Sequence, residues 1–340
     1  MDIDVLGALD VRENGVSIAP TAPKPRQVLA LLALHADRVV PVDSLIEELW
    51  SGRPPRSART TLQTYVLQLR ELIAVALAGT GVRQPGTGVR QLGAGVGESG
   101  AGVGQLGAGV GESGTVGESG AGVGELGAGV GEPGAVGGAG VGGRCAKDVL
   151  VTLPGGYLLC SGGGTSDVRE FERLAGLGYR AMDAGDFTGA ARSLAAGLGL
   201  WSGAAFADVQ SGVQLAMEVR RLDESRLCAL DQRIEADLRL GRHREVLAEL
   251  TVLTSRYRTH ENLHAQFMIA LHRSGRRGEA LSVFLRLRAT LGRELGLEPS
   301  ARLRGLQHTI LTAGPESVPV PARAVRGAAG PQPVPLAPVH

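Results

Sequence analysis

A glycine-rich tract in the middle of the chain is the feature that most limits the fold. From Gln91 to Gly143 the sequence repeats QLGAGVGESGAGVG with small changes, so Gly, Ala and Val dominate it. Such a segment cannot bury enough apolar surface to offset the entropy lost on ordering. It also lacks the regularly spaced aspartates of a calcium-binding repeat. We therefore predict that residues 80–146 are a disordered Gly-rich insert, and that the 340-residue chain folds from the sequence on either side.

The sequence before the insert predicts a small sheet followed by helices. Residues 2–19 have partial strand alternation, and Asn14-Gly15 is a strong hairpin turn between two of the strands. Three later segments have helical spacing of their apolar residues, and Ser57 can cap the last of them. They are residues 26–35, a short segment that ends near Trp50, and residues 57–73.

Ordered structure is expected to resume after the insert, in the segment DVLVTLPGGYLLC. Two apolar runs flank Pro154-Gly155-Gly156, which is the pattern of a β-hairpin. Joined to the preceding helices, this hairpin predicts a winged helix-turn-helix domain made of residues 1–79 with 147–160. The insert would then lie between the third helix and the wing.

A helical repeat pattern fills most of the remaining chain. Gly241 and Gly275 lie 34 residues apart, and several positions after them match at the same offset. This is the period of tetratricopeptide repeats, in which two helices joined by a turn form one unit. We predict a tetratricopeptide-like all-α domain over residues 166–313 and a disordered Pro-rich tail over 314–340. The expected fold class is mostly α, with a small α+β winged helix-turn-helix domain in front.

The third predicted helix has two different faces. Its apolar stripe consists of Leu62, Val66, Leu69 and Ile73. Its opposite face is short, polar and almost uncharged, and consists of Thr60, Gln63, Thr64, Leu67 and Gln68. Such a helix fits the major groove of DNA, where hydroxyls and amides can meet base edges. Arg53, Arg56 and Arg59 lie at or just before its positive end, which suits phosphate. The alternative is a packing helix whose polar face is only hydrated.

The segment HENLH at residues 260–264 offers a competing interpretation as a zinc hydrolase. It matches the H-E-x-x-H pattern, in which two His residues bind zinc and the Glu polarises water. The pattern falls at a helix start of the repeat register, after a polar segment, and not inside an apolar helix. No Walker A sequence and no nucleophile elbow occur in the chain. We therefore expect no enzyme activity, no catalytic residues, no metal and no cofactor.

Composition limits the partners and the compartment. The formal net charge is +1, so any signal for nucleic acid must be local. The three scattered cysteines suit a reducing cytosol. The sequence has no signal-peptide pattern and no stretch long and apolar enough to cross a membrane. We expect a cytoplasmic protein that associates with the nucleoid and not with a membrane.

Several segments of the chain together resemble the Streptomyces antibiotic regulatory protein (SARP) family. They are VLGALDV, PKPRQVLALLALHADRVVPVDSLIEELW, ARTTLQTYVLQLREL, TLPGGYLL, RIEADLRLGRHREVLAEL and LGRELGLEPSARLRGLQHTIL. The resemblance implies an OmpR-type winged-helix domain joined to a bacterial transcriptional activator domain of tetratricopeptide-like helices. It also implies a pathway-specific activator of antibiotic biosynthesis, which binds direct repeats of double-stranded DNA near promoters and recruits RNA polymerase.

The same resemblance implies roles for individual residues. The side chains that it places toward DNA are those of Thr60, Thr61, Gln63, Thr64 and Gln68. The basic residues that it places on phosphate or at the DNA backbone are Arg59, Arg70, Lys24 and Arg26. The residues that match the wing are Gly155, Gly156 and Tyr157. The loop SGRPPRS, with Arg53 and Arg56, corresponds to a segment that can face polymerase.

Departures from the family pattern remove basic residues from the expected DNA-facing surface. Leu67-Gln68 stands where the family usually has Ser-Arg. Glu71 and Thr152-Leu153 stand where further basic residues are frequent. Fewer phosphate contacts give weaker binding with a shallower salt dependence. A homodimer on a direct repeat would offset this loss through effective concentration. The alternative function is a helical-repeat adaptor whose degenerate winged helix does not bind DNA.

Overall fold

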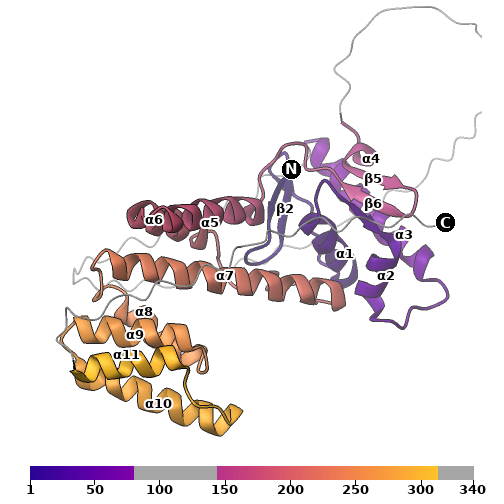
Figure 1. The fold of residues 1–340 in the computed structure, drawn as a ribbon. Helices are drawn as coiled ribbons and strands as arrows, with labels where there is room; N and C mark the ends of the chain where they lie inside the picture. The colour runs from indigo at the N-terminus through magenta and orange to yellow at the C-terminus, as the bar shows by residue number, and fades with distance from the viewer. Residues whose placement is uncertain (80–143, 313–340) are drawn as a thin grey trace, which may run out of the picture. The chain divides into compact units, whose positions relative to one another are not determined.

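The computed structural model describes residues 1–79 and 144–312, and Figure 1 shows how their helices and strands are arranged. This part is mostly helical, with small sheets near its start, which confirms the predicted fold class. The predicted Pro-rich tail and most of the predicted insert lie outside the described residues. One boundary is corrected, because residues 144–146 belong to the described fold and helix α4 (Ala146–Val149) begins there.

The chain begins with an antiparallel sheet of β1 (Asp2–Asp4), β2 (Asp10–Glu13) and β3 (Val16–Ser17), in that order. Asn14 and Gly15 connect β2 to β3 with positive φ angles of 51° and 79°. This pair of left-handed residues is what a tight hairpin turn requires, and Asn and Gly are the residues that adopt it most readily. The predicted hairpin is therefore confirmed.

Helices α1 (Pro23–Leu34), α2 (Val42–Trp50) and α3 (Ala58–Leu77) follow, and they confirm the predicted helical segments. Helix α1 begins at Pro23, three residues before the predicted start, because proline suits the first turn, where no intrahelical N–H bond is lost. Helix α3 extends four residues beyond the predicted Ile73. Ser57 is its N-cap residue, as predicted, but its side chain accepts no capping hydrogen bond.

The predicted wing is present as β5 (Leu150–Leu153) and β6 (Gly156–Leu159), which pair as an antiparallel hairpin. Gly155, in the turn, has a φ of 81°, a conformation that favours glycine. A strand that sequence reasoning missed, β4 (Val39–Pro41), pairs with β6 and completes a sheet of order β4-β6-β5. The wing is thereby hydrogen-bonded to the segment between α1 and α2.

The helical domain consists of consecutive helices, most of them joined by short turns, with a longer connection over residues 199–212 between α6 and α7. Gly185, Gly241 and Gly275 each have a positive φ in the turn between two helices, in agreement with the predicted helix–Gly turn–helix units. The helices are α5 (Asp167–Asp183), α6 (Phe187–Leu198), α7 (Val213–Arg239), α8 (Leu247–Arg256), α9 (Glu261–Arg273), α10 (Arg277–Leu295) and α11 (Ala301–Thr312).

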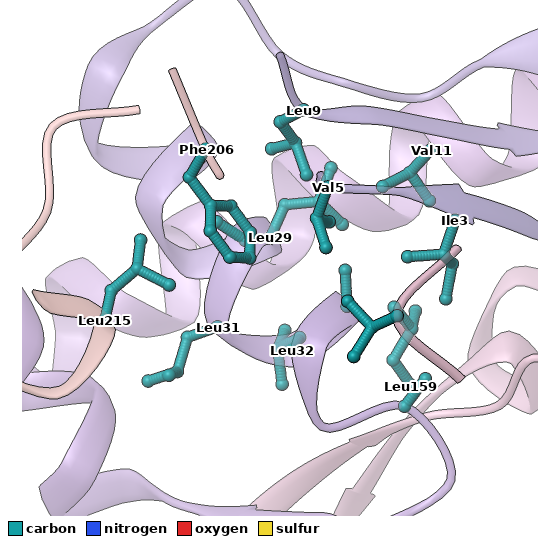
Figure 2. Packing of buried hydrophobic residues seen from close by; sticks show 14 of the residues in the cluster. Ile3, Val5, Leu9, Val11, Leu29, Leu31, Leu32, Leu159, Phe206 and Leu215 are labelled. Carbon is teal, nitrogen blue, oxygen red and sulfur yellow. The ribbon is translucent and has the colours of Figure 1, made fainter. Parts of the chain in front are cut away.

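The winged helix and the first part of the helical domain share one hydrophobic core. Figure 2 shows two side chains of the helical domain in this core, Phe206 beside Leu29 and Val5 of the winged helix, and Leu215 on the side of Leu31. Each side chain of this size contributes about 1.5–3 kcal/mol when it is fully buried. A second core is formed by α8, α9, α10 and α11 together with the second half of α7. One core therefore extends from the winged helix into the helical domain.

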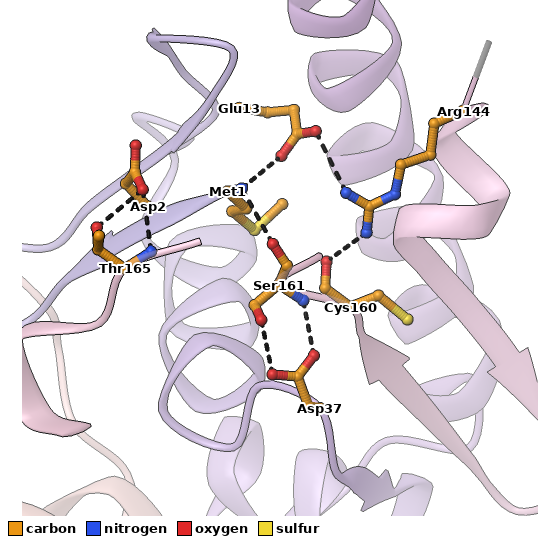
Figure 3. Close-up of polar contacts among 8 residues, drawn as sticks. All are labelled: Met1, Asp2, Glu13, Asp37, Arg144, Cys160, Ser161 and Thr165. Carbon is orange, nitrogen blue, oxygen red and sulfur yellow. Dashed lines mark hydrogen bonds and ion pairs between the residues drawn. The ribbon is translucent and has the colours of Figure 1, made fainter. Parts of the chain in front are cut away.

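Polar contacts attach the segment after the wing to the N-terminal sheet and to the turn that follows α1 (Figure 3). Asp37 accepts hydrogen bonds from the Ser161 amide at 2.8 Å and the Ser161 hydroxyl at 2.7 Å. Although burial raises the pKa of Asp37, these bonds and the contact with Arg169 bring it below its ordinary value. Arg144 lies 3.6 Å from the Glu13 carboxylate and donates to the Cys160 carbonyl at 2.9 Å. The start of the second described range is therefore fixed to the fold.

Candidate nucleic-acid interface

Helix α3 is held in the winged helix by the apolar stripe that its sequence predicts. Leu62, Val66, Leu69 and Ile73 are all buried in the shared core. They recur every three or four residues, so they share one side of the helix. The burial of this side fixes which residues of α3 face outward.

The outward side of α3 is polar and exposed, as the sequence predicts. Thr61 is half-buried at the edge of this face. The Thr64 hydroxyl donates to the carbonyl of Thr60 at 3.1 Å, so it is directed back to the helix. The exposed side chains are those of Thr60, Gln63, Thr64, Leu67 and Gln68. The face therefore offers amide donors and acceptors, with an apolar side chain among them.

Exposed arginines surround the N-terminal end of α3. Arg53 and Arg56 lie in the loop after α2 and are exposed. Arg59 is 74% exposed and lies 3.3 Å from the carboxylate of Asp43, which is 86% exposed. An exposed ion pair of this kind contributes little, so Arg59 can exchange it for another anion. With the partial positive charge of the helix end, these residues form a positive region beside the polar face.

Arg70 connects α3 to the wing. Its guanidinium donates to the Leu150 carbonyl at 2.7 and 3.0 Å and to the Thr152 hydroxyl at 2.8 Å. Both acceptors lie on β5. Arg70 therefore positions the wing against the helix through protein contacts, where the family resemblance expects a phosphate contact.

Two other residues predicted to contact DNA, Lys24 and Arg26, are half-buried and bond to other parts of the protein. Arg26 donates to the carbonyls of Pro20 and Leu9 and pairs with Asp208, so it joins the two domains. The Lys24 ammonium donates at 2.6 Å to the carbonyl of Leu49, at the C-terminal end of α2. Cations are favourable at this end of a helix because its carbonyls carry partial negative charge.

Some of the wing residues face the interior of the protein, and others are exposed. Tyr157 is only 6% exposed and belongs to the core, which corrects its predicted role at the DNA surface. Gly156 is buried beside the backbone of Val40, so it too faces the protein. Gly155 is exposed at the tip of the hairpin, where a ligand can approach its backbone.

Comparison with known proteins matches both parts of this architecture. A family model described as Transcriptional regulatory protein, C terminal, matches residues 18–80. One described as Bacterial transcriptional activator domain matches residues 166–311. Over 315 residues the chain is 45% identical to regulatory protein DnrI of Streptomyces peucetius, and the match covers 93% of each protein. The chain belongs to the SARP family of transcriptional activators. This confirms the resemblance seen in the sequence.

More distant relatives share the fold of this SARP chain. It is 28% identical over 315 residues to the transcriptional regulatory protein EmbR of Mycobacterium tuberculosis. It also matches a solved structure of EmbR in complex with a low affinity phosphopeptide, with a TM-score of 0.67 and 27% identity. This match covers 91% of the SARP chain and 64% of EmbR, so the chain spans less than two thirds of that relative.

A buried carboxylate in the SARP chain links the helix-turn-helix to the helical domain, and sequence reasoning missed it. Glu48, on α2, is 1% exposed and accepts from the amides of Gly212 and Leu215 at 2.5 and 2.9 Å. These amides belong to the N-cap residue and the first turn of α7, so Glu48 caps that helix from another domain. Gln27 also donates to the carboxylate at 2.8 Å. The detectable signal is a charge at helical spacing from Leu45, on the apolar side of α2.

The HENLH segment of the SARP chain has structural roles in α9. The His260 side chain caps the helix by accepting from the Leu263 amide, and the Glu261 carboxylate accepts from the Ser300 amide. His264 is buried, which lowers its pKa. In residues 1–79 and 144–312, no group of three His, Cys, Asp or Glu side chains is placed to hold a metal ion. Nor does any helix there combine the length and apolar character that a bilayer crossing needs.

Proposed function

We propose that this SARP-family chain is a sequence-specific DNA-binding transcriptional activator, whose helix α3 enters the major groove. The observation that carries the proposal is the division of α3 into a buried apolar side and an exposed polar side. The exposed side has the size and the donors and acceptors that base edges require. The activity is binding and recruitment, with no enzymatic step and no cofactor.

Each group of residues on this surface has a separate task in this proposal. The arginines at the N-terminal end of α3 bind phosphates and fix the register of the helix on the duplex. Gly155, at the tip of the wing, lies near the flanking minor groove, and Arg70 holds the wing in that position. The phosphate-binding arginines are Arg53, Arg56 and Arg59. The residues that meet base edges are Thr60, Thr61, Gln63, Thr64 and Gln68.

The proposed target is the control region of a secondary-metabolite cluster, by analogy with the antibiotic regulators of the family. Two subunits bind a direct repeat as a homodimer. Because binding of the first subunit raises the local concentration of the second, modest single-site affinities combine into a stable complex. The protein would act in the cytoplasm, on the nucleoid.

Contact with RNA polymerase is assigned to the loop between α2 and α3. Arg53 and Arg56 are exposed there, on a segment that precedes the polar face. The variant Arg53→Ala/Arg56→Ala should lower transcription activated in vitro more than it lowers DNA affinity. An equal loss of both would instead restrict these arginines to phosphate binding.

DNA binding is tested with purified full-length chain and the promoter regions of its neighbouring genes. Gel shifts at low and moderate salt should give a complex that survives excess nonspecific competitor, with a footprint over a direct repeat. A folded, dimeric protein that shifts no promoter would contradict the proposal.

That negative result would favour a second candidate, a helical-repeat adaptor without DNA binding. The feature that favours it is the exposed Glu71, which follows Gln68 along α3 and would repel phosphate. Such a protein would retain its helical-domain partners after the exposed side chains of α3 are replaced.

A further inference from the structure

Leu67 is a large apolar side chain in the middle of the exposed side of α3. It is 56% exposed, although Val66, its neighbour in sequence, is fully part of the core. Thr64 precedes it by three residues and Glu71 follows it by four, so these side chains lie along one strip of the helix. Leu67 therefore belongs to the surface that we assign to DNA.

Thr64 enlarges the apolar surface around Leu67. Its hydroxyl donates to the Thr60 carbonyl one turn earlier, at 3.1 Å. This bond directs the hydroxyl back to the helix backbone and leaves the methyl group as the outward branch of the side chain. The Thr64 methyl and Leu67 are neighbours on the helix surface, because they are three residues apart. A small apolar area thus interrupts the otherwise polar face.

The major groove contains one apolar group with which such an area can pair. Thymine carries a 5-methyl group at its groove edge, whereas cytosine and adenine present amino donors and guanine presents acceptors. Contact between leucine and the methyl group removes apolar surface from water on both molecules. Contact with an amino group would leave a buried donor without a partner. Both effects favour thymine.

We propose that Leu67, with the methyl group of Thr64, contacts the 5-methyl group of a thymine and thereby selects a T·A pair at one position of each half-site. The inference rests on the proposed DNA binding by α3. It adds a specificity determinant that the hydrogen-bonding residues of the helix do not supply, since a methyl group forms no hydrogen bond.

The test uses duplexes that the wild-type full-length chain selects from a random-sequence library. Deoxyuridine, which lacks the methyl group, replaces each thymidine in turn, and affinity is measured by fluorescence anisotropy. At one thymine of each half-site the replacement should weaken wild-type binding about fourfold, the effect of one methyl group no longer buried. For Leu67→Ala, the same replacement should change the affinity by less than about 1.5-fold, because the contact is already absent.

Leu285→Ala is the matched control, because Leu285 is 58% exposed and lies on α10 of the helical domain. It should keep the wild-type deoxyuridine penalty. If every penalty persists in Leu67→Ala while wild-type protein still binds selected DNA, the thymine contact is disproved and the proposed function stands. If wild-type protein selects no sequence, the proposed function itself fails. A large loss of thermal stability in Leu67→Ala would show that the side chain is packed, and would also overturn the inference.

Discussion

Helices α2 and α3 belong to the same helix-turn-helix but differ in what they contact. The buried side of α2 contacts both the winged-helix core and α7, where Glu48 caps the start of that helix. The outward side of α3 exposes its polar residues to solvent. One helix therefore attaches the activator domain, and the other leaves its surface available to a ligand.

This difference shows that amphipathic spacing defines a buried side of a helix but not which other elements that side contacts. Both helices have apolar residues at helical intervals, so their sequences predict similar packing. What distinguishes them is the position of charge. Glu48 lies among buried residues and forms several hydrogen bonds, whereas the face of α3 has few charges and few internal contacts. A buried charge in an amphipathic helix indicates a specific protein contact.

The largest expected effect comes from removing the contact of α2. Glu48→Ala leaves the amides of Gly212 and Leu215 without their side-chain acceptor and removes one of the two acceptors of the Gln27 side-chain amide. We expect the free energy of unfolding to fall by about 3 kcal/mol, as measured by urea denaturation. Glu47→Ala is the matched control, since Glu47 is exposed and its side chain bonds only to Gln214 among the described residues. Equal losses in the two variants would mean that the buried cap does not hold the domains together.

A smaller effect, on binding and not on stability, is expected for α3. Gln68→Ala should weaken binding to selected DNA roughly fivefold to thirtyfold, because a base contact contributes about 1–2 kcal/mol. Its unfolding free energy should remain within about 0.5 kcal/mol of wild type, because the side chain is exposed. Gln210→Ala, in an exposed loop of the helical domain, should change neither quantity. A large loss of unfolding free energy in Gln68→Ala would show that the polar side of α3 is packed against the protein, as α2 is.

The salt dependence of DNA binding reports how many phosphates the side chains of α3 contact. Glu71→Arg should increase the slope of log affinity against log salt by about 0.9, provided that the new side chain reaches one phosphate. Glu224→Arg makes the same charge change at an exposed position of α7 and should leave the slope nearly unchanged. Identical slopes in both variants would place Glu71 away from the duplex.

The smallest expected effect is on the pH dependence of the unfolding free energy, through His35 on the α7 side of the winged helix. Burial lowers the pKa of His35 below its ordinary 6.5, against the attraction of Glu218, while Arg38 and Arg221 lower it further. The unfolded chain thus binds the proton more readily, and stability should fall as the pH drops through 6.5. His35→Gln should reduce this pH dependence in urea denaturation between pH 8 and pH 6, by a small amount. An unchanged profile would assign the dependence to other groups.

Local patterns predicted much of the fold, because helices and hairpins leave periodic signals in a short stretch of sequence. The stripe on α3 and the turns at Asn14-Gly15 and Gly155 are of this kind. Strand β4 was not predictable, since three residues acquire strand structure only by pairing with β6, far away in sequence. The internal roles of Lys24 and Arg70 were hidden for the same reason. A basic residue near a recognition helix has the same local pattern whether it binds phosphate or a distant carbonyl.

The contact at Glu48 also fixes one end of helix α7, so that a rotation about this end moves the other end much further. Helix α7 has 27 residues, which corresponds to a rod of about 40 Å. Because the first turn of α7 is bonded to α2, a rotation of α7 by about 10° about that end would displace the opposite end by about 7 Å. Small adjustments of the helix-turn-helix on a duplex would therefore be amplified at the far end of the rod, where the next helices begin.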